Sequence, residues 1–316
     1  MERWTVGPSS VRRLAMITTV GIGLLVVAGG VVRLTGSGLG CDDWPNCNSE
    51  RFVDVSSGHA AIEQINRIFS GLIGLPTVLL VVAAWRVRPP MPAVRWPAVG
   101  VLVTVMANAV VGGLAVRGDL HPVLVQSHFL LAMASIAFGV VAINRSSSRP
   151  TSRQPTSPHA VAGSIGSRSR DGAAVVAALT TLALITGTVV TGTGPHAGDE
   201  DARRFGFDIS MVARVHSITV LIAIVAALAL AWQLRRDAAA RQLLGSTLSA
   251  WIFLGIVQGG VGYVQYLNGV PELLVGAHIA LATLLWAATV SLTDAAFTGS
   301  MSGERSAITA RVAGAA

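Results

Sequence analysis

The sequence predicts an all-α integral membrane protein of eight transmembrane helices, arranged as two four-helix bundles that are parallel repeats of one unit. Three observations support this fold class. Hydrophobic residues make up 52% of the 316 residues and charged residues only 12%, a far more apolar composition than that of soluble domains. Eight apolar runs are each close to the ~20 residues needed to cross the hydrocarbon core of a bilayer. Polar side chains inside these runs recur at a constant separation.

Taken in order, the eight predicted spans cover residues 14–34, 62–85, 96–116, 123–143, 173–193, 209–232, 243–267 and 273–292. The first span follows Arg12 and Arg13, as the apolar core of a signal peptide would. It is longer than such a core and has no clear cleavage motif of small residues. We therefore expect it to be the first transmembrane helix.

Four polar side chains lie near the starts of alternate spans: Asn66 and His128 in the first half of the chain, His216 and His278 in the second. The two members of each pair are 62 residues apart, and the second pair follows the first by 150 residues. An ionisable side chain inside a membrane needs a partner or a cavity. The matched spacing predicts two copies of one unit in the same orientation.

The same offset of 150 residues relates Gly112 to Gly262. Small residues let helices approach each other, so these glycines predict either tight packing or space for a planar ligand. We expect residues 1–143 to form an N-terminal half and residues 172–316 a C-terminal half with a short tail.

Residues 144–171, rich in serine and arginine, predict a flexible cytoplasmic linker in which His159 has no expected role. All 23 basic residues are arginines, and sixteen of them lie in the N-terminus, the C-terminal tail and alternate connections. By the positive-inside rule this distribution places both termini in the cytoplasm. The net charge of +7 therefore reflects membrane topology, and we expect no binding of nucleic acid.

The two cysteines, Cys41 and Cys47, lie in the loop 36–61 on the predicted outer side. Disulfides persist on that oxidising side, and the spacing is a poor match to zinc sites. We expect a structural disulfide that closes the loop. The alternative is a redox or metal-handling pair of thiols.

Glu63, Asn66 and Arg67 begin the second span. Glu63 and Asn66 share one face of the predicted helix, and Arg67 follows Glu63 by one turn. One interpretation is a partly solvated Glu63–Arg67 ion pair near the membrane surface. The interpretation that we favour is a carboxylate that points into a cavity, beside the ligand of His128.

His216 and His278 on facing helices suit axial ligation of a haem, because imidazole binds iron and an apolar bundle accommodates the porphyrin. Arg214 is a candidate to bind a haem propionate. Zinc would require three or four protein ligands, and the second half offers no further cysteine or carboxylate at that depth apart from Glu272. The alternative is a pair of packing histidines that are hydrogen-bonded across the bundle.

Several motifs together resemble the haem A synthase family over nearly the whole chain. They are Thr-Gly-Ser-Gly-Leu-Gly-Cys followed by Trp-Pro-x-Cys within residues 35–47, Glu63-x-x-Asn66-Arg67, Gln126-Ser127-His128, Thr-Gly-Thr-Gly-Pro-His-Ala-Gly-Asp at residues 191–199, Arg214-x-His216 and Ala277-His278. The resemblance implies an eight-helix membrane enzyme that oxidises the methyl group at position 8 of haem O to a formyl group. The product, haem A, serves cytochrome c oxidase.

The resemblance also implies roles for individual residues. A haem b cofactor would lie on His216 and His278, and haem O would bind in the first half near His128, Asn66 and Arg67. Glu63 corresponds to the family's glutamate that is important for activity. The implied partners are haem O synthase and a membrane electron acceptor. The implied location is a bacterial plasma membrane. The resemblance leaves open whether the chain acts as a monomer or as a homo-oligomer.

Asn66 departs from the family pattern, since many members have histidine at that place. Asparagine is a feeble ligand of iron, so the sequence predicts that His128 alone binds the iron of haem O. An open iron position suits oxygen chemistry. His59, about two turns before Asn66, is not expected to replace the missing ligand.

The main alternative function is a di-haem membrane cytochrome b that carries electrons, as in quinol or ferric reductases. It would use the same histidines without Glu63, and Asn66 counts against it because electron transfer favours two six-coordinate haems. A transporter of haem or metabolites is a third hypothesis. The spans lack the central glycine or proline breaks that are typical of transporters.

Overall fold

A computed structural model describes residues 5–147 and 165–313, which form eight α-helices. The helices are α1 (Pro8–Leu34), α2 (Gly58–Arg86), α3 (Pro92–Arg117), α4 (Pro122–Ser147), α5 (Ser167–Thr193), α6 (Ile209–Leu234), α7 (Ala238–Leu267) and α8 (Glu272–Ala313). Each predicted span lies within one of these helices, and all eight are long and apolar enough to cross a membrane. The prediction of an all-helical, multi-pass membrane protein is confirmed.

Polar residues cap the first turn of several helices, and two of these, α2 and α7, begin before their apolar run. Ser57 accepts a hydrogen bond from the backbone N–H of Ala60 at the start of α2. Asp208 and Asp237 do the same at the starts of α6 and α7. Capping satisfies backbone N–H groups that have no partner within the helix. The apolar run therefore marks the part of each helix that fits the hydrocarbon core, and the helix continues into the polar region beyond it.

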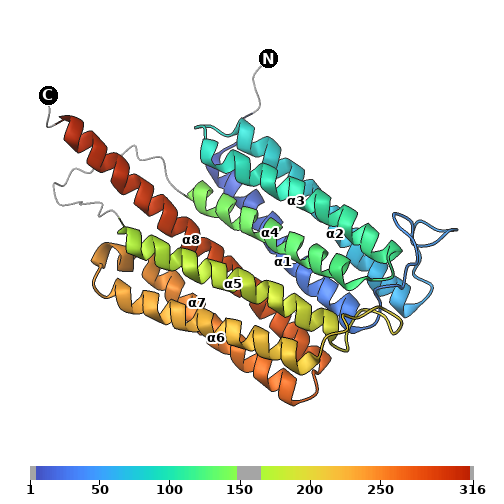
Figure 1. The fold of residues 1–316 in the computed structure, drawn as a ribbon. Helices are drawn as coiled ribbons and strands as arrows, with labels where there is room; N and C mark the ends of the chain where they lie inside the picture. Colours follow the sequence, from blue (N-terminus) through green and yellow to red (C-terminus); the bar gives the residue numbers. More distant parts are fainter. Residues whose placement is uncertain (1–4, 148–164, 314–316) are drawn as a thin grey trace.

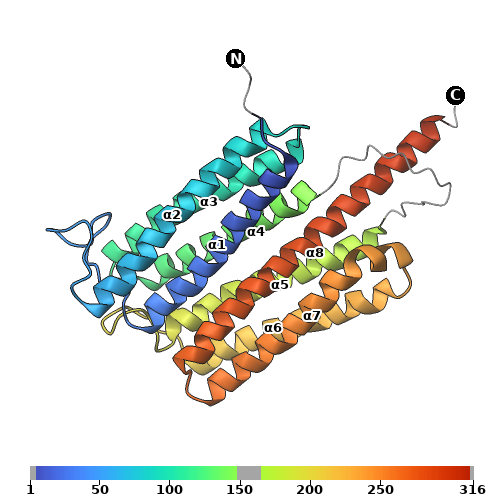
Figure 2. The same cartoon turned by 180° about the vertical axis from the view of Figure 1, so that it is seen from behind.

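The helices pack as two groups of four (Figures 1 and 2). In the first group α1 packs on α2 and α4, and α3 lies between α2 and α4; in the second, α5 packs on α6 and α8, and α7 lies between α6 and α8. The two groups meet mainly through α1, α4, α5 and α8. That the groups are copies of one unit stays a prediction from the sequence.

Polar contacts join the two groups along their whole length. Trp286 donates to the carbonyl oxygen of Met133 at 2.8 Å, and the Arg145 guanidinium forms an ion pair with Asp294 at 3.1 Å. At the opposite end, Arg33 of α1 donates to the carbonyl oxygens of Thr191 and His196, beyond which α6 begins. Such bonds are strong where water is excluded, so they fix the relative position of the halves.

We call the end of the bundle at which α1 ends and α2 begins the disulfide end. The connections 35–57, 118–121, 194–208 and 268–271 all lie there. At the other end, α4 continues to Ser147 and α5 begins at Ser167, so the predicted linker 144–171 is helical at both margins. Residues 148–164, including His159, lie outside the described residues.

Candidate functional site

The four side chains singled out in the sequence all lie near the disulfide end. His128, His216 and His278 are six or seven residues from the first residue of α4, α6 and α8, and Asn66 is eight residues into α2. At 1.5 Å per residue, this depth is about 9–12 Å from the helix start. Candidate sites in both halves are therefore at similar depth.

His216 and His278 face each other inside the second half. Their ring centroids are 6.5 Å apart and the ring planes are inclined by 75°. The rings are not hydrogen-bonded to each other; the Nδ1 atom of His278 is buried and has no partner in the described part of the chain. The two rings are therefore not bonded to each other, and that they share a ligand stays a prediction.

A hydroxyl group orients the ring of His216. Nδ1 of His216 lies 3.1 Å from Oγ1 of Thr186, and this hydroxyl itself donates to the carbonyl oxygen of Leu182 at 2.9 Å. Thr186 therefore accepts from Nδ1–H, and the lone pair of His216 is on Nε2. A hydrogen bond to the other ring nitrogen is the usual partner of a metal-binding imidazole.

His128 is oriented in the same way by the backbone of α3. Its Nδ1 lies 3.0 Å from the carbonyl oxygen of Asn108. Since a carbonyl oxygen only accepts, the proton is on Nδ1 and Nε2 carries the lone pair. In the second half, the side chain of Gln258 on α7 instead donates to the backbone carbonyl of His278 at 3.0 Å.

Each of the three histidines lies against a glycine of the preceding helix. A Cβ atom at Gly112 would come within 2.8 Å of Cε1 of His128, and one at Gly262 within 3.1 Å of Cε1 of His278. The sequence offset had marked these two glycines. It had not marked Gly187, where a Cβ atom would lie 3.0 Å from Cε1 of His216. The glycines thus make room for imidazole rings between helices.

The distance between the rings of His216 and His278 is compatible with a haem iron bound between them. Two metal–nitrogen bonds of about 2 Å each, together with the half-widths of two imidazole rings, place ring centroids about 6 Å apart. The observed 6.5 Å is close to that value. The described residues contain no group of three or more His, Cys, Asp or Glu side chains arranged for a metal ion. A porphyrin supplies its own four nitrogens and needs only axial ligands from the protein.

In the first half, Asn66 precedes His128 by 62 residues, as His216 precedes His278; that the two places correspond in space stays a prediction from the sequence. Oδ1 of Asn66 is buried and has no hydrogen-bond partner in the described residues. Oδ1 of Asn108, on the helix that orients His128, is in the same state. Buried polar atoms are nearly always hydrogen-bonded, so these two amides indicate a site that accepts a polar ligand.

Glu63 is buried and is held by the loop and by Arg67. Its side chain is 6% exposed and lies 2.6 Å from Nη2 of Arg67, and Oε2 accepts from the backbone N–H of Cys41 at 2.8 Å. The predicted Glu63–Arg67 pair is therefore formed, but it is shielded from water rather than solvated. The structure shows both carboxylate oxygens engaged by these donors.

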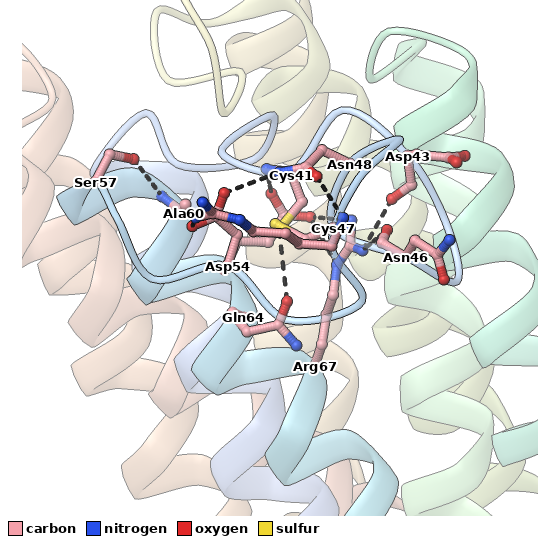
Figure 3. Close-up of a disulfide and its surroundings, with 12 residues drawn as sticks. Cys41, Asp43, Asn46, Cys47, Asn48, Asp54, Ser57, Ala60, Gln64 and Arg67 are labelled. Carbon is pink, nitrogen blue, oxygen red and sulfur yellow. Dashed lines mark hydrogen bonds and ion pairs between the residues drawn. A yellow bond between two sulfur atoms is a disulfide. The ribbon is translucent and has the colours of Figure 1, made fainter.

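Cys41 and Cys47 form the predicted disulfide, and both are almost fully buried. Figure 3 shows the disulfide above α2, with Gln64 pointing toward it; Oε1 of Gln64 is 3.7 Å from Sγ of Cys41. The disulfide loop thus packs on the start of α2. Arg214, by contrast, is exposed on α6 with no ion-pair partner in the described residues.

The fold and these sites define a multi-pass membrane protein with partly buried histidines at similar distances from the helix starts in two helical groups. The sequence pattern of the COX15-CtaA family, described as cytochrome oxidase assembly protein, matches residues 12–61 and 51–290. The chain belongs to this family.

Curated relatives match a shorter segment. The proteins named heme A synthase of Bacillus cereus (strain AH187), Bacillus anthracis (strain A0248) and Bacillus thuringiensis subsp. konkukian (strain 97-27) are each 30% identical to the chain over 128 residues. This segment is 40% of the chain and 41% of each relative. The match therefore spans less than half the length of these relatives.

Proposed function

We propose that the protein is a haem A synthase, which oxidises the methyl group at position 8 of haem O to a formyl group. The geometry of His216 and His278 is the observation that carries this proposal, because it suits a haem held between two imidazoles. Membership of a cytochrome oxidase assembly family and the name of the curated relatives support it. The enzyme would be an oxidoreductase that acts on a carbon–hydrogen bond.

The second half is the proposed cofactor site. His216 and His278 would hold a haem b, with Thr186 fixing the ring of His216. When bound, this haem would supply one-electron transfer. Arg214, exposed two residues before His216, is the proposed partner of a propionate, since arginine binds carboxylates with two parallel hydrogen bonds.

The first half is the proposed substrate site. His128 would bind the iron of haem O through Nε2, and the Asn66 amide would face the opposite side with a hydrogen bond to water or another small ligand. Glu63 would act at the methyl carbon, where a buried carboxylate positions water or stabilises developing positive charge. Arg67 would fix that carboxylate.

The overall reaction replaces two C–H bonds of the methyl group by a C=O bond. Its oxygen comes from water, and the electrons and protons released pass to a membrane electron acceptor and to solvent. Haem O synthase would supply the substrate and cytochrome c oxidase would receive the product. The arginine distribution supports cytoplasmic termini, and the bacterial origin of the curated relatives supports a bacterial plasma membrane.

The proposal is tested by identifying the haems that copurify with the protein. Pigments extracted from the purified membrane protein are separated by reversed-phase chromatography and their masses measured. We expect protohaem together with haem O or its oxidised products. A preparation that contains protohaem alone, from cells that accumulate haem O, would favour a di-haem cytochrome instead.

A further inference from the structure

All three guanidinium nitrogens of Arg67 are hydrogen-bonded, and Nη1 joins α2 to the disulfide loop. Nε and Nη2 donate to Oε1 of Glu63 at 3.0 and 2.6 Å. Nη1 donates to the carbonyl oxygens of Asp43 and Asn46 at 2.9 and 3.0 Å. Figure 3 shows the side chain extending from α2 into the loop between these residues. One arginine thus bonds a carboxylate of the helix and two backbone atoms of the loop.

Three backbone groups of the loop in this network belong to the ring that the disulfide closes, and the backbone of Gly40, directly before the ring, also contacts the Glu63 carboxylate. That ring comprises residues 41–47. It supplies the N–H of Cys41, which donates to Glu63, and the carbonyl oxygens of Asp43 and Asn46, which accept from Arg67. The positions of these three backbone groups therefore depend on the closure of the ring.

Water does not replace these bonds easily, because the network is buried. The side chains of Arg67 and Glu63 are 16% and 6% exposed. Removing one partner of a buried ion pair leaves the other uncompensated, which costs far more than the loss of an exposed pair. The geometry of the carboxylate is thus set by Arg67 and by the ring together.

The ring and Gly40, the residue directly before it, also pack closely against the helices of the first half. A Cβ atom at Gly40 would overlap the backbone of His59, at the start of α2. A Cβ atom at Gly113 would lie 2.5 Å from the indole ring of Trp44, and the neighbouring Gly112 contacts His128. The ring therefore covers the disulfide end of the first half and touches both helices that border His128 and Glu63.

We propose that Arg67 is a positioning residue for Glu63, and that the ring closed by Cys41 and Cys47 is the anchor against which it acts. This inference rests on the proposed function, in which Glu63 acts on haem O. Opening the ring would release the carbonyl oxygens of Asp43 and Asn46 and so loosen the carboxylate. The disulfide is then part of the scaffold of the active site, and no electrons need pass through it.

A matched control exists on the same ring. Arg117 of α3 binds the side chain of Asp43 at 3.2 Å; these side chains are 58% and 39% exposed, and neither touches Glu63. The backbone N–H of Trp44 and the Arg117 guanidinium hold the pKa of Asp43 below its ordinary value. Arg117→Gln thus removes an arginine that contacts the ring, but it removes no hydrogen bond to Glu63 or Arg67.

The first measurement does not depend on activity. Hydrogen-exchange mass spectrometry of peptides that cover residues 41–47 is compared in the wild type, Arg67→Gln, the double variant Cys41→Ser with Cys47→Ser, and Arg117→Gln. We expect at least about tenfold faster exchange at Cys41 in the first two variants, as for loss of a protecting local structure. Arg117→Gln should remain close to the wild type. Unchanged exchange in Arg67→Gln would overturn the proposed anchor.

The second measurement separates positioning from general stability. Haem A formed per bound haem is compared for Arg67→Gln, Glu63→Gln and the double variant. We expect each single variant to lose at least about tenfold, since small misplacements of a catalytic group have large effects. The double variant should be no worse than Glu63→Gln, because Arg67 acts through Glu63.

If Arg67→Gln fails to retain haem, Arg67→Lys takes its place, because lysine keeps a cation beside Glu63 but lacks the separate nitrogens that bind the carboxylate and the loop carbonyl oxygens at once. Two results would overturn the inference and leave the proposed function intact. One is a loss of haem A formation in the double variant that equals the product of the two single losses. The other is full haem A yield from the Arg67 variants. A wild-type protein that makes no haem A would overturn the proposed function, and the exchange measurement would still test the anchor.

Discussion

The imidazole rings of His216 and His278 lie with their centroids 6.5 Å apart in the second half of the bundle, without a hydrogen bond between them. Thr186 fixes the first ring, and the second has a buried Nδ1 atom without a partner among the described residues. Two rings held apart in this way in an apolar bundle are suited to a shared ligand.

Replacing either His216 or His278 by alanine should abolish a low-spin bis-histidine haem spectrum. The remaining imidazole would leave the iron one axial ligand short. Optical and electron paramagnetic resonance spectra of the purified variants check this result. His159→Ala, in the segment between α4 and α5, serves as the control and should keep the wild-type spectrum. Unchanged low-spin signals in both single variants would show that the ligands are elsewhere.

Gly262→Ala should weaken haem binding in the second half. The added methyl group would lie 3.1 Å from Cε1 of His278, and such overpacking typically costs about 1–3 kcal/mol. The matched control is Gly260→Ala, because a Cβ atom there meets nothing within 4 Å. Haem content per protein measures both. Equal haem content in the two variants would mean that the glycine does not position the ring.

His128→Ala should eliminate binding or turnover of haem O, whereas Asn66→Ala should cost far less. An amide beside the sixth coordination position of the haem O iron contributes only a hydrogen bond to a ligand bound there, worth roughly 1 kcal/mol. Asn66→His should retain the substrate and add a new low-spin signal. Titration of the purified variants with haem O gives the affinities. Full activity of His128→Ala, or an equal loss in Asn66→Ala, would contradict the single-ligand account.

Glu63→Gln should stop the reaction before haem A while haem binding survives. Glutamine has nearly the same shape but carries no negative charge to stabilise developing positive charge at the carbon. We expect haem O and its hydroxymethyl derivative to accumulate, as measured by chromatography and mass spectrometry of extracted haems. Gln64→Ala, which changes the neighbouring side chain beside the disulfide, should still produce haem A. A normal haem A yield from Glu63→Gln would exclude the carboxylate from the mechanism.

The sequence was sufficient to predict the helices, because eight long apolar runs leave little choice of structure in a bilayer. Their ends were less predictable. The cap at Asp237 extends α7 five residues before the predicted span, and such caps depend on local geometry rather than on hydropathy. Matched spacing also indicated which polar side chains lie at similar depth.

The environment of Glu63 was only partly predictable. Its pairing with Arg67 follows from a separation of one helical turn. The bonds of this pair to Cys41, Asp43 and Asn46 depend on the course of a loop that has no repeating pattern. Gly187 was missed for a related reason: it lies in α5, where the offset of 150 residues does not relate the two halves, so no equivalent glycine marked it.

The most direct test of the proposed function is production of haem A in a host that makes haem O but lacks its own haem A synthase. Membranes from cells that express this chain are extracted, and the haems are identified by mass and by the absorption of the formyl group. We predict haem A with the wild-type chain, and haem O with its hydroxymethyl derivative but no haem A with Glu63→Gln. Persistence of haem O as the sole product with the folded, haem-containing wild-type protein would contradict the account.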